Sequence, residues 1–200
     1  MGEVELPIDG MLKYIQMTDK LILKINASIE KHKQFLEGSP IEKMTSAKLF
    51  DFYRKKSAHQ LYYHSIFIAE YSFLEKKLLQ LLKIAELKKS VKISDVAGKG
   101  IFKYYLYLQK VLGVDMSNVK NEWENIVKYN HLRNLLVHHP TSTIEVKSLN
   151  DNRLKILKSI DYLKLEQKGN SFEFEISDKL LLIDFAETIR EFLVGVFFDD

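Results

Sequence analysis

The sequence predicts an all-α fold, a bundle of about five helices with one small β-hairpin before the last helix. The 200 residues include only three prolines and eight glycines, so few positions interrupt a helix. Apolar residues also recur at three- and four-residue steps over long stretches. Near the C-terminus the pattern changes to strict alternation, which predicts the hairpin. No repeat or linker divides the chain, so we expect one domain over 1–200, with an added hairpin and helix at about 161–198.

The N-terminal half is expected to form two helices. Apolar spacing predicts the first over about 8–36. Thr45 or Ser46 is suited to cap the second, which continues to about Leu87. Because that helix is long for a globular protein, we expect a kink or break near Ser57.

Two shorter helices are predicted in the middle of the chain. The first, over about 101–112, is rich in aromatic residues and ends at Gly113. Ser117 is expected to cap the next one. It should end at or before His139, because the residue before a proline is disfavoured in the α region. The polar stretch 141–149 then indicates a loop.

The C-terminal part predicts a hairpin followed by a helix. Apolar and polar residues alternate on both sides of Gly169 and Asn170, a dipeptide suited to a tight turn between two strands. Ser177 or Asp178 is suited to cap the final helix, which should reach about Phe198.

The composition excludes several classes of protein. The chain has no cysteine, which excludes a disulfide scaffold, a thiolate metal site and a cysteine nucleophile. A net charge of +3 neither requires nor forbids a nucleic-acid partner. The start lacks the pattern of a signal peptide, and no window approaches the ~18 apolar residues of a membrane span. We therefore expect a soluble, cytoplasmic protein without a membrane partner.

The stretch HLRNLLVHHP, residues 131–140, places strong hydrogen-bonding groups beside an apolar run. On a helix, Arg133 and Asn134 lie about 100° apart, and Arg133 and His138 about 140° apart. A ligand held between Arg133 and His138 therefore requires a frayed helix end or a second copy across a dimer axis. Residues 135–137 span about 200°, which is wide for one buried stripe. Both features favour a helix that packs on its own chain and on a partner.

The motif Arg133-Asn134-Leu-Leu-Val-His138 resembles the signature of the HEPN superfamily (higher eukaryotes and prokaryotes nucleotide-binding domains). That signature is an arginine, usually followed by a polar residue, and a histidine a few residues later. The order of helices agrees over most of the chain, whereas the hairpin and last helix lie outside the common pattern. The resemblance implies a homodimeric, metal-independent endoribonuclease that acts on RNA. It also implies a role as a toxin or in anti-phage defence, restrained by an antitoxin partner protein.

Under this resemblance, each motif residue has a role in RNA cleavage. Arg133 would stabilise charge on the phosphate oxygens in the transition state. His138 would act as acid or base, because imidazole titrates near pH 7. Asn134 would orient the histidine or donate to the phosphate. The neighbouring His139 is the accessory alternative, although Pro140 displaces it.

A carboxylate on the preceding long helix would hold the arginine in place, as the resemblance implies. Glu75 is the first choice for this role and Glu70 is the rival. The alternative for either residue is a position on a solvated helix face.

No metal or cofactor is expected. His59 and His64 have poor spacing for zinc without a cysteine or a second acidic ligand, and they are better explained as partly buried histidines. Two alternatives to the nuclease remain. One is a non-catalytic HEPN-like module that binds nucleotide or protein, and the other is a structural helical adaptor.

Overall fold

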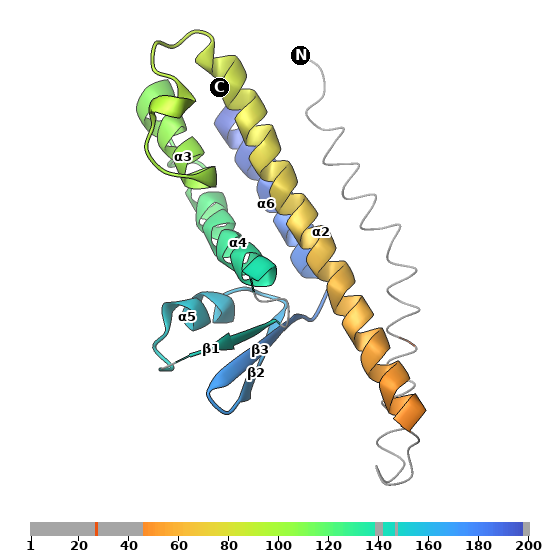
Figure 1. Ribbon diagram of the computed structural model, residues 1–200. Coiled ribbons are helices and arrows are strands. Elements are labelled where there is room, and N and C mark those ends of the chain that lie inside the picture. The colour runs from red at the N-terminus through yellow and green to blue at the C-terminus, as the bar shows by residue number, and fades with distance from the viewer. Residues whose placement is uncertain (1–26, 28–45, 139–141, 147, 198–200) are drawn as a thin grey trace.

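The computed structural model describes residues 27, 46–138, 142–146 and 148–197. Of the helix predicted over 8–36, Ala27 alone is described, and it is helical; the rest of that range and Thr45 lie outside the described residues. The described chain is mostly helical and carries a small three-stranded antiparallel sheet (Figure 1). The expectation of a helical fold is therefore met at this level, although the sheet is larger than a hairpin.

Three helices form the main bundle: α2 (Ser46–Glu86), α4 (Lys120–His138) and α6 (Leu180–Phe197). In Figure 1, α6 runs alongside α2 in the same direction, and α4 runs the opposite way. The prediction of a break near Ser57 is wrong, because α2 is one continuous helix of 41 residues. Its sequence contains neither proline nor glycine, the residues that most often interrupt a helix.

Aromatic rings tie the three helices together. Phe67 of α2, Tyr129 of α4 and Phe185 of α6 meet in the core, with ring centres 4.5 to 5.8 Å apart. Aromatic pairs at this distance add stabilisation beyond the burial of apolar area. The stripe that α2 buries follows the three- and four-residue spacing of an amphipathic helix: Tyr63, Ile66, Phe67, Tyr71, Leu74, Leu78 and Leu82.

The segment between α2 and α4 is less regular than predicted. After a 3-10 turn, η2 (Ile93–Asp95), comes α3 (Gly100–Tyr107), and a π-helical turn, η3 (Leu108–Leu112), completes the predicted helix. Gly113 ends it with a φ of 75°, as expected for a glycine at a helix C-terminus.

The limits of α4 concern two predictions. The helix begins at Lys120, later than expected, because Ser117 lies in the preceding turn, where its N–H is bound by Asp115. The described helix extends to His138, and the prediction that it stops at or before His139 concerns residues outside the described part of the chain.

The sheet has the strand order β1-β3-β2, with β1 (Thr143–Glu145), β2 (Leu163–Lys168) and β3 (Ser171–Ile176). The predicted hairpin is confirmed, and Gly169 adopts a φ of 62° in its turn. The prediction of a loop over 141–149 is wrong for β1, which pairs with β3 and buries Ile144 completely. A three-residue strand was missed because it is too short to show alternation.

A short helix, α5 (Asn152–Lys158), follows β1 and was also not predicted. Asp151 caps it by accepting a hydrogen bond from the Arg153 N–H at 2.8 Å. The sheet is then fixed to the bundle by Gln60, whose side-chain amide forms two hydrogen bonds with the backbone of Ile176. At the next helix, Asp178 accepts from the Leu180 N–H, which confirms one of the two predicted caps.

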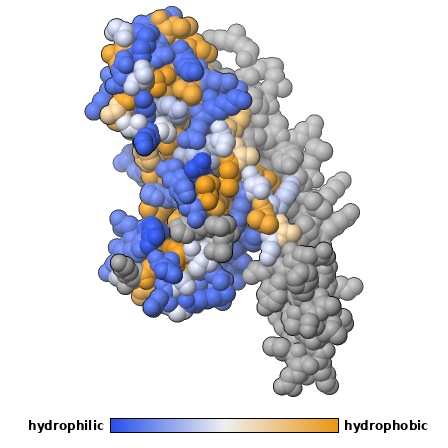
Figure 2. All heavy atoms as spheres, in the orientation of Figure 1, coloured by the Kyte–Doolittle hydropathy of each residue, from blue (hydrophilic) through white to orange (hydrophobic). Residues whose placement is uncertain are grey.

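The surface is mixed in character. The face in Figure 2 is largely hydrophilic, and hydrophobic residues emerge in separate patches. The most exposed large apolar side chains of the bundle helices include Leu61, Ile84, Val137 and Val194. Among these, Val137 is the one that lies next to the predicted motif histidine.

Candidate functional site

Arg133 lies where α4 packs against α2. Because Tyr129, Leu132 and Leu136 of α4 are buried, Arg133 sits beside the core and its side chain is half-buried. Its guanidinium carbon lies 5.6 Å from the centre of the Tyr71 ring on α2. A guanidinium over an aromatic face at this distance gains cation–π stabilisation. Tyr71 therefore positions the charged end of Arg133.

Two asparagines complete the surroundings of this guanidinium. Arg133 Nη1 donates to Asn134 Oδ1 at 3.0 Å, so this amide oxygen contacts the arginine. The Tyr71 hydroxyl donates to Asn130 Oδ1 at 2.7 Å, which fixes the ring beneath the guanidinium. The arginine is thus held by uncharged groups.

No carboxylate neutralises Arg133 within the described part of the chain. The ion pairs found there do not include it, and its Nε is buried without a hydrogen-bond partner. A guanidinium has five N–H donors, and among the described residues one acceptor, Asn134 Oδ1, uses one of them. A half-buried cation with unused donors is suited to bind an anion that presents several oxygens.

Glu75 lies close to this arrangement without pairing to Arg133. Burial raises the pKa of Tyr71, the charge of Glu75 raises it further, and the charge of Arg133 lowers it. The two charges therefore act on the same hydroxyl. Glu75 Oε1 also lies 3.2 Å from where a Cβ at Gly100 would be, so glycine lets α3 begin close to this carboxylate.

Glu70 occupies a different environment from Glu75. Its side chain is fully buried, and neither carboxylate oxygen has a hydrogen-bond partner among the described residues. Burial raises the pKa of Glu70 well above its ordinary value, which favours the neutral form. In its charged form, Glu70 would raise the pKa of Tyr129. Glu70 thus faces the core side of α2, whereas its neighbour Tyr71 faces Arg133.

His138 is the last described residue of α4 and is exposed. It forms no hydrogen bond, ion pair or ring contact with another described residue, so nothing within the described chain brings it to Arg133. The accessory candidate His139 lies outside the described residues.

Two other histidines of α2 are structural in character. His59 is buried and its ring centre lies 4.4 Å from that of Tyr63. Burial lowers the pKa of His59, partly offset by Glu175, and burial lowers the pKa of His64 to about 4. Among the residues described, no group of histidine, aspartate and glutamate side chains is arranged to hold a metal ion.

Tyr71 and Asn130 were missed as members of this site. Tyr71 belongs to an apolar stripe in the sequence and is indistinguishable there from a core residue. The available signal was the spacing from Asn130 to Arg133 and Asn134, which places the three side chains on neighbouring turns of one helix.

The described part of the chain contains no helix with the length and apolarity needed to cross a membrane. Comparison of the whole sequence and structure with protein-family models, curated proteins and solved structures found no significant match.

Proposed function

We propose that this protein is a metal-independent endoribonuclease of the HEPN type, in which Arg133 binds the scissile phosphate. The observation that carries the proposal is the half-buried guanidinium with unused donors and no carboxylate partner among the described residues. A charged group removed from water needs compensation. A phosphodiester, with its negative charge and two non-bridging oxygens, supplies it.

The proposed chemistry is a transesterification. A base removes the proton of a ribose 2′-hydroxyl, and the oxygen attacks the adjacent phosphorus. The bond from phosphorus to the 5′-oxygen breaks, and an acid gives that oxygen a proton. The products are a 2′,3′-cyclic phosphate and a 5′-hydroxyl. His138 is the acid or base, and Arg133 stabilises the charge on the non-bridging oxygens.

We infer a homodimer in which each active site combines residues of both copies. Within one chain, Arg133 and His138 share no contact, so a second copy is the simplest source of the histidine. Val137 is 42 % exposed at the end of α4, and it offers an apolar surface for that copy beside His138. A toxin or anti-phage role in the cytoplasm, with an antitoxin partner protein, completes the proposal.

The second candidate is a non-catalytic module that binds nucleotide or protein. The same lack of contact between Arg133 and His138 favours it, because an anion-binding arginine needs no histidine. The two candidates differ in whether RNA is cleaved.

The deciding experiment incubates purified protein with single-stranded RNA in the presence of EDTA and analyses the product ends. We expect 2′,3′-cyclic phosphate ends. Arg133→Ala and His138→Ala should each lower the rate on the order of 10²–10³-fold, a typical effect of removing a transition-state contact. His131→Ala and Arg153→Ala are matched controls and should cleave at the normal rate.

A mixing experiment tests the shared site. Arg133→Ala and His138→Ala proteins should each cleave slowly when alone, but a mixed dimer contains one site with both residues intact. Activity should therefore return on mixing and subunit exchange. Intact RNA with the unaltered protein would refute the nuclease and leave the binding module.

A further inference from the structure

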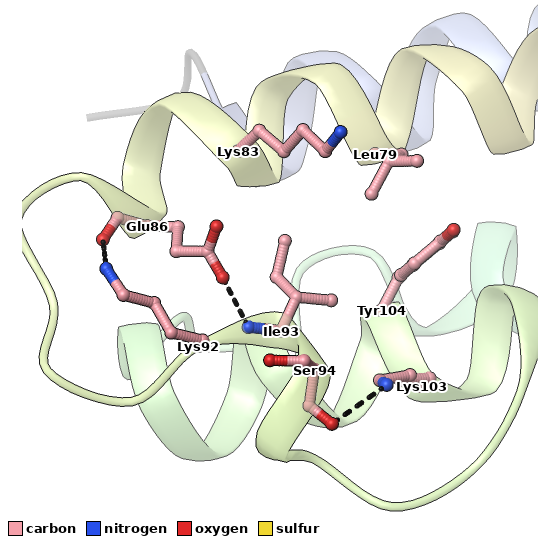
Figure 3. Close-up of a pocket in the computed structure, with 8 residues that line it drawn as sticks. All are labelled: Leu79, Lys83, Glu86, Lys92, Ile93, Ser94, Lys103 and Tyr104. Carbon is pink, nitrogen blue, oxygen red and sulfur yellow. Dashed lines mark hydrogen bonds between the residues drawn. The ribbon is translucent and has the colours of Figure 1, made fainter.

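A cavity of about 420 Å³ opens near the C-terminal end of α2, between that helix, η2 and α3. Its volume lies within the range of small-molecule sites. Three lysines line it, together with an apolar and aromatic surface (Figure 3). Its lining includes Lys83, Lys92, Lys103, Leu79, Ile93 and Tyr104.

The three lysines are not neutralised by ion pairs within the described chain. Lys83 Nζ forms no hydrogen bond with a described residue. Lys92 Nζ lies 3.5 Å from the Glu86 carbonyl at the end of α2 and 3.3 Å from the Lys89 carbonyl after it. Lys103 Nζ lies 3.3 Å from the Ser94 carbonyl. These long contacts leave ammonium donors free on each lysine.

The nearby carboxylates are already used by the η2 turn. Glu86 lines the cavity, but its Oε1 accepts from the Ile93 N–H. Asp95 lies beside the cavity, and its Oδ2 accepts from the Lys92 N–H at 2.8 Å. The charges of Lys92 and Lys103 still act on Asp95. Three lysines lie beside these two carboxylates, however, so a net positive charge remains for an anion.

The remaining wall suits the uncharged part of a ligand. Leu79 and Ile93 supply apolar surface. The Tyr104 side chain reaches the same space in Figure 3, and its hydroxyl forms no hydrogen bond with a described residue. An aromatic ring beside lysines is a combination that accepts a flat group next to a phosphate.

We propose that this cavity binds a small phosphate ester of mononucleotide size, with the phosphate at the lysines and the flat group against Tyr104 and Leu79. The lysine end of the site is separate from Arg133. Tyr71, which lies under Arg133, is twelve residues from Lys83 on α2, or about 18 Å along the helix, and eight residues from Leu79, or about 12 Å. The proposal does not depend on the proposed nuclease activity.

Calorimetric titration of the full chain with ADP, pyrophosphate and adenosine tests this. ADP and pyrophosphate should bind and adenosine should not, because the phosphate carries the affinity. Lys83→Ala/Lys103→Ala should weaken ADP binding at least tenfold, because it removes two charged donors that would bind the phosphate. Lys88→Ala/Lys110→Ala removes the same charge from exposed lysines outside the cavity and should bind ADP normally.

Two further variants separate the parts of the site. Tyr104→Leu should weaken ADP binding and leave pyrophosphate binding unchanged. Arg133→Ala should leave both unchanged. No binding of ADP or pyrophosphate by the unaltered protein would overturn the proposal, as would equal affinities in the two lysine pairs. A single-stranded RNA that binds while ADP does not, and that depends on Lys83 and Lys103, would assign the cavity to an RNA path instead.

Discussion

Two arginines of this chain have opposite surroundings. Arg153, at the start of α5, is exposed and forms an ion pair with Asp151 at 2.7 Å, and it also donates to the Glu145 carbonyl at 2.9 Å. Arg133, on α4, is half-buried, and its described contacts are an asparagine and the ring of Tyr71. The arginine with better access to water thus has the charged partner.

This difference separates a structural arginine from a candidate binding arginine. The contacts of Arg153 join β1 to α5, and they use its guanidinium as a local clamp. Those of Arg133 fix its direction without neutralising its charge. An anion therefore has more to gain at Arg133, because most donors there have no acceptor among the described residues.

The largest expected change in stability follows substitution of Tyr71. Its ring, and not a carboxylate, lies beneath the guanidinium of Arg133. It is 2 % exposed and also stacks near Phe185. Tyr71→Ala should lower the free energy of unfolding by about 3–5 kcal/mol, as expected for a large buried ring. Tyr71→Phe keeps the ring and loses the bond to Asn130, so its loss should be about 1 kcal/mol.

Urea denaturation measures both values. Cleavage by the Tyr71→Phe protein should remain, because the surface beneath the guanidinium is unchanged. Equal losses of stability in the two variants would show that the hydroxyl, and not the ring, supports this region.

A smaller change in stability is expected for substitution of Glu70. Like Arg133, Glu70 has no charged partner among the described residues, but its side chain is fully buried. Burial raises its pKa above the ordinary 4.5, so the folded carboxyl keeps a proton that the unfolded chain has lost. Its contribution to stability is full below pH 4.5 and falls as the pH rises towards the raised pKa. Glu70→Met should therefore stabilise the protein, by about 1–3 kcal/mol at pH 8 and by less at pH 5.

Thermal unfolding at pH 5 and pH 8 measures this difference. Glu187→Met, an exposed carboxylate on α6, is the control and should show no such change with pH. A stabilisation by Glu70→Met that is the same at both pH values would contradict a buried, protonated Glu70.

The smallest expected change in the free energy of unfolding is the one that follows substitution of the two arginines. Arg153→Met should lower the free energy of unfolding by about 1 kcal/mol or less, because exposed ion pairs contribute little, and high salt should reduce the difference. Arg133→Met removes an unneutralised, half-buried charge and should leave the stability unchanged or higher. Differential scanning calorimetry at low and high salt measures the stability of both variants. A larger loss for Arg133→Met than for Arg153→Met would make Arg133 the structural residue.

The sequence predicted the long elements well and the short ones poorly. The helical periodicity of α2 and α6 and the alternation around Gly169 were sufficient, because each pattern repeats several times along the chain. In contrast, β1 and α5 contain three and seven residues. Strand β1 exists because β3 supplies its hydrogen-bond partners, and no local pattern records that.

The candidate site also has a part that the sequence predicted and a part that it did not. The sequence by itself determined which helix carries Arg133, Asn134 and His138, since helix propensity and the proline after His139 act locally. Only the tertiary structure decided that Tyr71 lies under Arg133, that Glu70 is sealed in the core, and that Lys83 and Lys103 meet at one cavity. These relations depend on how separate helices pack, and packing is set by contacts between residues far apart in the chain.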